Sequence, residues 1–394
     1  MLELLNAPQG DPILSVMTAY QEDIRPDKID LGIGIYKDEN GQTPIMHSVR
    51  NAAVTLAVSE ESKSYVGLVG DEQFNTAMQD LVLKGTKAIL RASTLQTPGA
   101  SGALRMLADL IKMARPNARV WLSNPSYINH RPIMEKAGLQ VFEYPYLDVT
   151  TKQVDEEAML RVVETLGCED VLLIHGCCHN PSGADLSFEA WEKIAQLAQK
   201  NGFLPFIDIA YQGLGDDMDK DAKGLRMLVD KVDEALISTS CSKNFGLYRE
   251  RTGAVIVIGK ILQKAKDTRI IMGELARGSY SMPPSHGAAI VAKILNDTIL
   301  KKQWQQELEE MRNRVLGLRK GLVNAFRKQT DSNRFDYIGL HKGMFSMTGL
   351  NEEQIQSLQK DHSIYLIRGG RINIAGLQEH QIDKVVSAFI AVGA

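Results

Sequence analysis

Three polar side chains that can take part in covalent or acid–base chemistry each stand at the end of an apolar, β-branched run. Asn180 follows DVLLIHGCCH, Asp208 lies inside FLPFIDIAY, and Lys243 follows ALISTSCS. Because ligands bind beyond the carboxyl ends of the strands in an open parallel sheet, we expect these side chains to meet at one edge. A carboxylate inside an apolar run needs a partner, although an aspartate there can also cap the next helix. The sequence therefore predicts a site that combines an amide, an acid and an amine.

Groups that can bind an anion flank the lysine. Lys243 lies in the segment 240–245, SCSKNF, and Arg251 follows eight positions later. Hydroxyls and a guanidinium around an amine form an anion site, although such a segment can also be a polar surface loop. Upstream, the segment 96–102, QTPGASG, leads directly into a helical pattern. A turn of this kind presents backbone N–H groups to phosphate, or it only caps the helix.

One ligand would suit all of these groups. It carries a phosphate for the anion site, an aldehyde that Lys243 can trap, and a ring nitrogen that Asp208 can keep protonated. Pyridoxal phosphate has these three features. The sequence thus predicts a pyridoxal phosphate enzyme that works through a Lys243 Schiff base.

The elements that must position these residues alternate between strands and helices. We expect strands at 119–123, 139–144, 170–175, 203–210, 235–240 and 253–259, and helices at 128–138, 155–166 and 188–201. This alternation predicts an α/β fold with a largely parallel sheet that helices cover on both faces.

The last hundred residues have a different pattern, which predicts a smaller α+β domain. A helix at about 300–328 is too long for a simple βαβ unit. After it we expect short strands at 335–338, 344–347, 364–367 and 371–374, and helices at 351–361 and 378–391. The predicted divisions are residues 1–43 for an N-terminal arm and part of the small domain, 44–305 for the large cofactor-binding domain, and 306–394 for the small domain.

Composition excludes several classes of protein. The 394 residues contain 45 Lys and Arg against 48 Asp and Glu, a net charge of −3, which argues against a binder of nucleic acid or of a membrane surface. No apolar run approaches the roughly 20 residues that span a bilayer, and the first residues do not look like a secretion signal. The cysteines 168, 177, 178 and 241 are too few and too clustered for a disulfide framework. We expect a soluble cytoplasmic protein.

The chain resembles the fold-type I pyridoxal phosphate aminotransferases, and among them the class I aspartate and aromatic-amino-acid aminotransferases. The resemblance runs from GDPIL (10–14) and LGIGIYKDE (31–39) to GRINIAG (370–376). Its most specific stretches are HGCCHNPSG (175–183), DIAYQG (208–213), SCSKNFGLYRERTG (240–253) and YSMPPSHG (280–287). It implies a large domain with a mostly parallel seven-stranded sheet flanked by helices, and a smaller α+β domain.

The resemblance also implies roles for individual residues at the cofactor. Lys243 would form the Schiff base and carry the proton, Asp208 would pair with the pyridine nitrogen, and Asn180 and Tyr211 would hydrogen-bond the ring's 3-oxygen. The ring face and the phosphate would be held by Gly99, Ala100, Ser101, Tyr127, Ser240, Ser242, Arg251 and, from a neighbouring subunit, Tyr65.

Substrate would be bound by a further set of matching positions, which are Gly34, Tyr127, Asn180, Arg277, Phe345 and Arg371. Arg371 would bind the α-carboxylate, helped by Asn180 and the Gly34 backbone. Tyr65 and Arg277 match positions that reach across a dimer interface in the family, where Arg277 would meet the second carboxylate of a dicarboxylic substrate. A homodimer with shared active sites is implied.

One position departs from the family pattern. The family usually has a tryptophan on the cofactor face where this chain has Tyr127, which can still stack on the ring but with less area and with a polar hydroxyl. His130, three residues later, is expected to support Asp208 from behind.

Two substrate preferences stay open. We favour transfer of the amino group of phenylalanine, tyrosine, tryptophan or aspartate to 2-oxoglutarate by a ping-pong mechanism, because several stretches resemble bacterial aromatic aminotransferases. The alternative is an aspartate aminotransferase restricted to dicarboxylic substrates.

A β-lyase or decarboxylase on the same fold would share Lys243 and Asp208 but would not need Arg277. A regulatory protein on this fold is expected to carry an additional DNA-binding segment.

A cluster of metal-ligand side chains lies in the segment 175–179, HGCCH. Imidazole and thiolate groups bind zinc. However, neighbours on a strand point to opposite faces, and no second CxxC or HxxxH motif is present. We therefore predict a buried strand end and no metal site.

Overall fold

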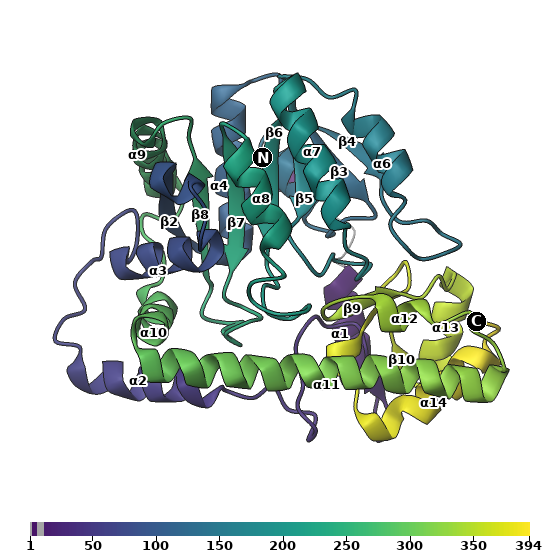
Figure 1. Cartoon of the computed structure of the whole chain (residues 1–394). Helices are drawn as coiled ribbons and strands as arrows, with labels where there is room; N and C mark the ends of the chain where they lie inside the picture. The colour runs from purple at the N-terminus through teal and green to yellow at the C-terminus, as the bar shows by residue number, and fades with distance from the viewer. Residues whose placement is uncertain (1, 6–11) are drawn as a thin grey trace.

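The computed structural model describes residues 2–5 and 12–394, so Gly10 and Asp11 of the GDPIL motif lie outside the described residues. A seven-stranded sheet with the strand order β2-β8-β7-β6-β5-β3-β4 forms its centre (Figure 1). The strands are β2 (Ala92–Pro98), β3 (Arg119–Asn124), β4 (Gln140–Pro145), β5 (Asp170–His175), β6 (Leu204–Ile209), β7 (Ala235–Ser240) and β8 (Thr252–Ile258). Strand β8 is antiparallel to β2 and β7, and the other pairs are parallel. The predicted mostly parallel α/β sheet is confirmed.

The sheet is buried on both faces because its strands are apolar at nearly every position. In β6, Phe206 faces one hydrophobic core while Ile207 and Ile209 face the other. Helix α1 (Pro12–Glu22) lies beside the C-terminal region, where Tyr20 meets Tyr365 edge to face (Figure 1). The helices that surround this sheet or connect to it are α2 (His47–Ser59), α3 (Glu72–Leu83), α4 (Gly99–Ala114), α5 (His130–Lys136), α6 (Glu156–Val163), α7 (Phe188–Asn201), α8 (Lys223–Lys231), α9 (Leu262–Ser279) and α10 (Ser285–Asn296).

The long predicted helix is present as α11 (Thr298–Thr330), which extends along the base of the molecule from α2 to the C-terminal region (Figure 1). The C-terminal region contains α12 (Tyr337–Leu340), β9 (Phe345–Met347), α13 (Glu352–His362), β10 (Ile364–Tyr365), β11 (Arg371–Asn373) and α14 (Ile382–Ala391). Strand β1 (Ile29–Asp30) pairs in parallel with β10, so a segment near the N-terminus joins this region. The domain boundaries at 43 and 305 stay a prediction.

One local expectation was wrong. The segment 335–338, expected as a strand, forms a turn and the start of α12, because Phe335 stacks on Phe326 of α11 with ring centroids 3.9 Å apart and Arg319 binds the carbonyl of Ile338. Tertiary packing thus decides the conformation of this short segment. Helix α1 and strand β2 were not among the expected ranges.

Candidate active site

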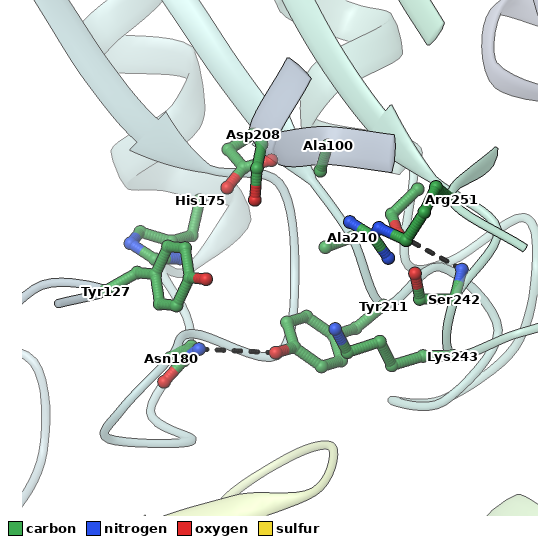
Figure 2. Close-up of a pocket in the computed structure, with 12 residues that line it drawn as sticks. Ala100, Tyr127, His175, Asn180, Asp208, Ala210, Tyr211, Ser242, Lys243 and Arg251 are labelled. Carbon is green, nitrogen blue, oxygen red and sulfur yellow. Dashed lines mark hydrogen bonds between the residues drawn. The ribbon is translucent and has the colours of Figure 1, made fainter. Parts of the chain in front are cut away.

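A cavity of about 240 Å³ lies beyond the carboxyl ends of β5, β6 and β7. Figure 2 shows its side chains around one central space, with Asp208 on one side, Lys243 and Tyr211 opposite, and Arg251 to the right. The cavity is lined by Ala100, Ser101, Tyr127, His175, Asn180, Asp208, Ala210, Tyr211, Ser240, Ser242, Lys243 and Arg251. The three groups that the sequence placed at neighbouring strand ends, Asn180, Asp208 and Lys243, therefore share one cavity.

Asp208 is held by its neighbours in the sheet. In the strand register it lies between His175 on β5 and Ser238 on β7. The Ser238 hydroxyl donates to Asp208 Oδ1 at 2.8 Å, and His130 Nε2 lies 3.0 Å from Oδ2, as expected for a support from behind. Burial by itself raises the pKa of Asp208, but the hydrogen bonds of His130 and Ser238 together with the charges of His130 and His175 outweigh burial, and the pKa falls below its ordinary value. A carboxylate is thus kept ionised in the floor of the cavity.

A polar chain continues behind His130. Ser126 Oγ lies 3.0 Å from His130 Nδ1 and 3.4 Å from His175 Nε2. Burial lowers the pKa of His175 to about 3, with the charge of His130 acting in the same direction. Neither Ser126 nor His175 was assigned a role from the sequence, and the only sequence signal for them is their position at strand ends.

Lys243 lies on a loop that is held in place by contacts with helix α11. The indole N–H of Trp304 donates to the carbonyl of Asn244 at 2.7 Å, and Trp304 stacks on Phe245 with centroids 4.4 Å apart. The ammonium nitrogen of Lys243 lies 5.4 Å from the ring centroid of Tyr211. Burial lowers the pKa of Lys243 to about 8, although the charge of Asp208 opposes this effect. An amine in this range is a competent nucleophile near neutral pH.

Asn180 connects the cavity to the C-terminal region. Its Nδ2 donates to Tyr211 Oη at 3.2 Å, and its Oδ1 accepts from Arg371 Nη1 at 3.2 Å. Arg371 Nη2 donates to the carbonyl of Gly32 at 2.8 Å. Burial lowers the pKa of Arg371, but a guanidinium remains cationic. Gly32 was not among the expected residues.

Aromatic packing orients the Arg371 guanidinium. Its central carbon lies 4.2 Å from the ring centroid of Phe345, and strands β9 and β11 pair Phe345 with Asn373. A Cβ on Gly34 would lie 2.8 Å from Phe345 Cζ, so a larger residue would push the ring. Arg371 Nε is buried without a hydrogen-bond partner among the described residues. The expected substrate positions Gly34, Phe345, Asn180 and Arg371 are therefore contiguous.

The anion site is built from close backbone contacts. Helix α4 begins at Gly99, so the N–H groups of its first turn face the cavity at Ala100 and Ser101. Gly99 has a φ of 69°, and a Cβ there would lie 2.5 Å from Arg251 Nη2. Ser240 Oγ accepts from the N–H of Ser242 at 3.1 Å. These positions bring N–H donors, hydroxyls and one guanidinium together in a cradle that suits an anion such as a phosphate group.

Tyr127 forms a side wall of the cavity. Its hydroxyl accepts from Asn129 Nδ2 at 3.0 Å, and its ring meets His130 edge to face. Burial raises the pKa of Tyr127, so the phenol remains protonated. Both Asn124–Pro125 before it and Asn180–Pro181 are cis peptide bonds.

Two expected site residues lie away from this cavity within the described part of the chain. Tyr65 is 91% exposed, and Arg277, near the end of α9, is exposed as well. Neither lines the cavity. The chain alone thus brings together the other expected cofactor positions but leaves Tyr65 and Arg277 at the surface.

Known proteins share both this sequence and this fold. Residues 26–389 match the family model described as aminotransferase class I and II. The chain is 44% identical over 388 residues to the aromatic-amino-acid aminotransferase of Pseudomonas aeruginosa, covering 98% of this chain and 97% of that protein. It is 39% identical over 395 residues to the aspartate aminotransferase of Escherichia coli K12, covering 100% of both. The chain belongs to the class I and II aminotransferase family, and it is an aminotransferase.

A solved relative agrees with the fold. The aromatic-amino-acid aminotransferase of Burkholderia pseudomallei, covalently bound to pyridoxal phosphate, superposes with a TM-score of 0.96 at 34% identity, covering 100% of this chain and 99% of that one. Pyridoxal phosphate is therefore the cofactor that the family implies for this chain. Among the described residues, no helix is long and apolar enough to cross a membrane.

Proposed function

We propose that this aminotransferase uses pyridoxal phosphate, bound in the cavity around Lys243, to move amino groups from aromatic amino acids and aspartate to 2-oxoglutarate. The observation that carries the proposal is the arrangement of one amine, one ionised carboxylate and one anion-binding cradle around a single space. The donor set fits the cofactor, because Lys243 faces the space and the cradle at Gly99 leaves room that a Cβ would fill.

The cofactor, when bound, supplies an aldehyde and an electron-withdrawing ring that stabilises negative charge at the substrate Cα. Asp208 would hold a proton on the ring nitrogen, and its bonds to Ser238 and His130 keep it from turning away. Lys243 would react with the aldehyde and afterwards move the proton to and from Cα. Asn180 and Tyr211 would donate to the ring's 3-oxygen, with the Asn180 side chain held at its other end by Arg371.

Substrate recognition would begin at Arg371. Its guanidinium is planar and suits a carboxylate bidentately, and it already lies between Asn180, Gly32 and the Phe345 ring. The α-carboxylate of an amino acid would bind here. An ordered guanidinium with one unpartnered N–H among the described residues supports this assignment.

We infer that two copies of the chain share their active sites. Tyr65 is exposed, although the family resemblance places it at a phosphate. The segments around Tyr65 and Arg277 also expose apolar side chains, because Val66 is 41% exposed and Ile270 is 66% exposed. The two segments lie side by side, since a Cβ on Gly273 would lie 3.8 Å from Leu68 Cβ. A surface of this kind supports a homodimer in which Tyr65 and Arg277 complete the partner's site.

The aromatic preference has support from the relative with the higher identity, which is an aromatic-amino-acid aminotransferase. An aspartate aminotransferase restricted to dicarboxylic substrates is the second candidate, because Arg277 would suit a second carboxylate. The four cysteines are free thiols, which supports the expected cytoplasmic location.

The absorption spectrum of the purified holoprotein tests the proposal. Phenylalanine added without an oxo-acid acceptor is expected to convert the visible cofactor band to that of the pyridoxamine form. A band that responds only to aspartate would favour the second candidate. A protein that shows no band after incubation with pyridoxal phosphate would contradict the proposal as a whole.

A further inference from the structure

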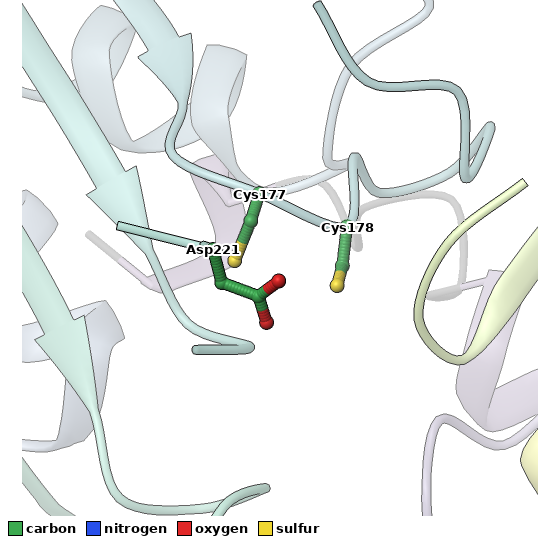
Figure 3. Close-up of side chains that lie close together, drawn as sticks. All are labelled: Cys177, Cys178 and Asp221. Carbon is green, nitrogen blue, oxygen red and sulfur yellow. The ribbon is translucent and has the colours of Figure 1, made fainter. Parts of the chain in front are cut away.

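Two thiols and a carboxylate converge on the side of His175 that faces away from the active-site cavity. They are Cys177, Cys178 and Asp221, and their ligand atoms all lie within 4.8 Å of one another. Figure 3 shows both sulfur atoms and the carboxylate directed toward a common point. His175 lines the active-site cavity and also a second cavity beside this cluster.

The backbone explains why neighbouring cysteines face the same way. Strand β5 ends at His175, so the alternation of faces that applies within a strand stops before the cysteines. Cys178 has a φ of 51°, in the left-handed region, and its N–H donates to Asp185 Oδ2 at 2.8 Å. This turn brings the second thiol to the side of the first. The chain is therefore not an extended strand at Cys177 and Cys178, contrary to the expectation from the sequence.

Asp221 is oriented toward the thiols by the loop that precedes α8. Its Oδ2 accepts from the N–H groups of Gly213 and Gly215 at 2.8 and 2.9 Å, and its Oδ1 accepts from Asp216 N at 2.8 Å. A carboxylate oxygen accepts two hydrogen bonds, so Oδ1 keeps one lone pair. The carboxylate is thus held rigidly with a free coordination position. Asp221 lies 43 positions after Cys178, which is why spacing alone does not reveal it.

The walls of the cluster are tight except on one side. A Cβ on Gly343 would lie 2.8 Å from Cys178 Sγ, and one on Gly215 would lie 2.6 Å from Asp221 Oδ1. On the open side, Cys177 and Asp221 line the second cavity, which has a volume of about 270 Å³. A small ion can therefore enter, whereas a larger ligand cannot reach both thiols.

We propose that Cys177, Cys178 and Asp221 bind one thiophilic divalent cation, Zn²⁺ or Cd²⁺, with a water molecule from the second cavity as the fourth ligand. Two sulfur ligands and one oxygen ligand suit these ions. Tetrahedral zinc with bonds of about 2.0–2.3 Å places its ligands about 3.3–3.8 Å apart, so ligand atoms that lie within 4.8 Å of one another must approach by at most about 1 to 1.5 Å. Binding releases the two thiol protons to solvent and involves no redox change.

The test is a titration of the purified, cofactor-loaded protein with Cd²⁺. We expect one equivalent of Cd²⁺ per chain and an ultraviolet thiolate-to-metal band. Cys177→Ser and Cys178→Ser are expected to weaken binding at least about 100-fold, and Asp221→Asn less. Cys168→Ser, which removes the exposed cysteine outside the cluster, serves as the matched control and should behave like the native protein. Loss of the band in the control, or its persistence in both cluster variants, would overturn the proposal.

A second measurement avoids variants that could misfold. X-ray absorption of the native protein with one equivalent of Zn²⁺ is expected to show two sulfur and two oxygen or nitrogen neighbours. Zero or one sulfur neighbour would overturn the site. Both measurements report the metal site directly, so they succeed or fail independently of the proposed transamination.

Discussion

The two sets of site residues in this chain differ in how they are held. Lys243, Asp208, Asn180 and Arg371 each lie inside the chain with a fixed partner or a packed neighbour. Tyr65 and Arg277, which the same family resemblance assigns to the site, are exposed. Lys243, Asp208, Asn180 and Arg371 are therefore pre-organised within one chain. The family resemblance assigns Tyr65 to the cofactor phosphate and Arg277 to a second substrate carboxylate, and we infer that both act on the site of a second copy.

The largest loss of activity should come from removing the Lys243 amine, which is one of the buried site residues. Lys243→Ala is expected to lower kcat by at least about 10⁴-fold, because both the covalent attachment and the proton carrier are lost. Turnover with phenylalanine and the cofactor absorption band measure this. Lys260→Ala, which changes an exposed lysine that pairs with the exposed Asp233, is the control. Substantial turnover by Lys243→Ala would remove the basis of the mechanism.

Replacing the exposed Arg277 should cause a smaller loss of activity, and only with dicarboxylic substrates. Arg277→Ala is expected to raise the barrier for aspartate and 2-oxoglutarate by about 2 to 3 kcal/mol, or roughly 30- to 150-fold in kcat/KM. The half-reaction with phenylalanine should change little, because its side chain carries no charge. Single-turnover rates with the two amino acids make the comparison. Equal losses for both would mean that Arg277 is not a distal-carboxylate residue.

The burial of Lys243 predicts that the rate of cofactor uptake depends on pH. Because burial lowers the pKa of Lys243 to about 8, the cofactor-free amine is mostly protonated below that pH and neutral above it. Only the neutral amine attacks an aldehyde, so the rate of cofactor uptake should fall roughly tenfold per pH unit below 8 and level off above it. In Asp208→Asn, which removes a negative charge that favours the ammonium, the midpoint should shift lower. A midpoint near that of a free lysine would show that the pocket does not desolvate the amine.

The smallest effect is expected at Tyr127, which forms a side wall of the active-site cavity. Tyr127→Phe keeps the ring but removes the hydroxyl that accepts from Asn129, so cofactor affinity should fall by about 2- to 10-fold. Tyr127→Ala removes the stacking area as well and should bind still more weakly. Equilibrium dialysis of the cofactor compares the two. A Phe variant as weak as the Ala variant would assign the binding to the hydroxyl and not to the ring.

Much of the fold was predictable because the strands of a parallel sheet are buried on both faces. The run DVLLIH can be little else than an interior strand, and it is β5. The segment 335–338, FDYI, mixes apolar residues with an acidic one over only four positions, and stacking of Phe335 on Phe326 accompanies its turn into the start of α12. A short segment that has no β-strand partner takes the conformation that its packing neighbours impose.

The sequence by itself determined which chemical groups this protein carries and at which strand ends they stand, because residue type and a period of two are local properties. Only the tertiary structure decided what those groups do to one another. Burial lowers the pKa of Lys243, His130 keeps Asp208 ionised, and the left-handed turn at Cys178 brings two thiols to a carboxylate 43 residues further on. Each of these effects depends on the distance between residues far apart in the chain and on the exclusion of water between them. Neither quantity can be derived from a short stretch of sequence.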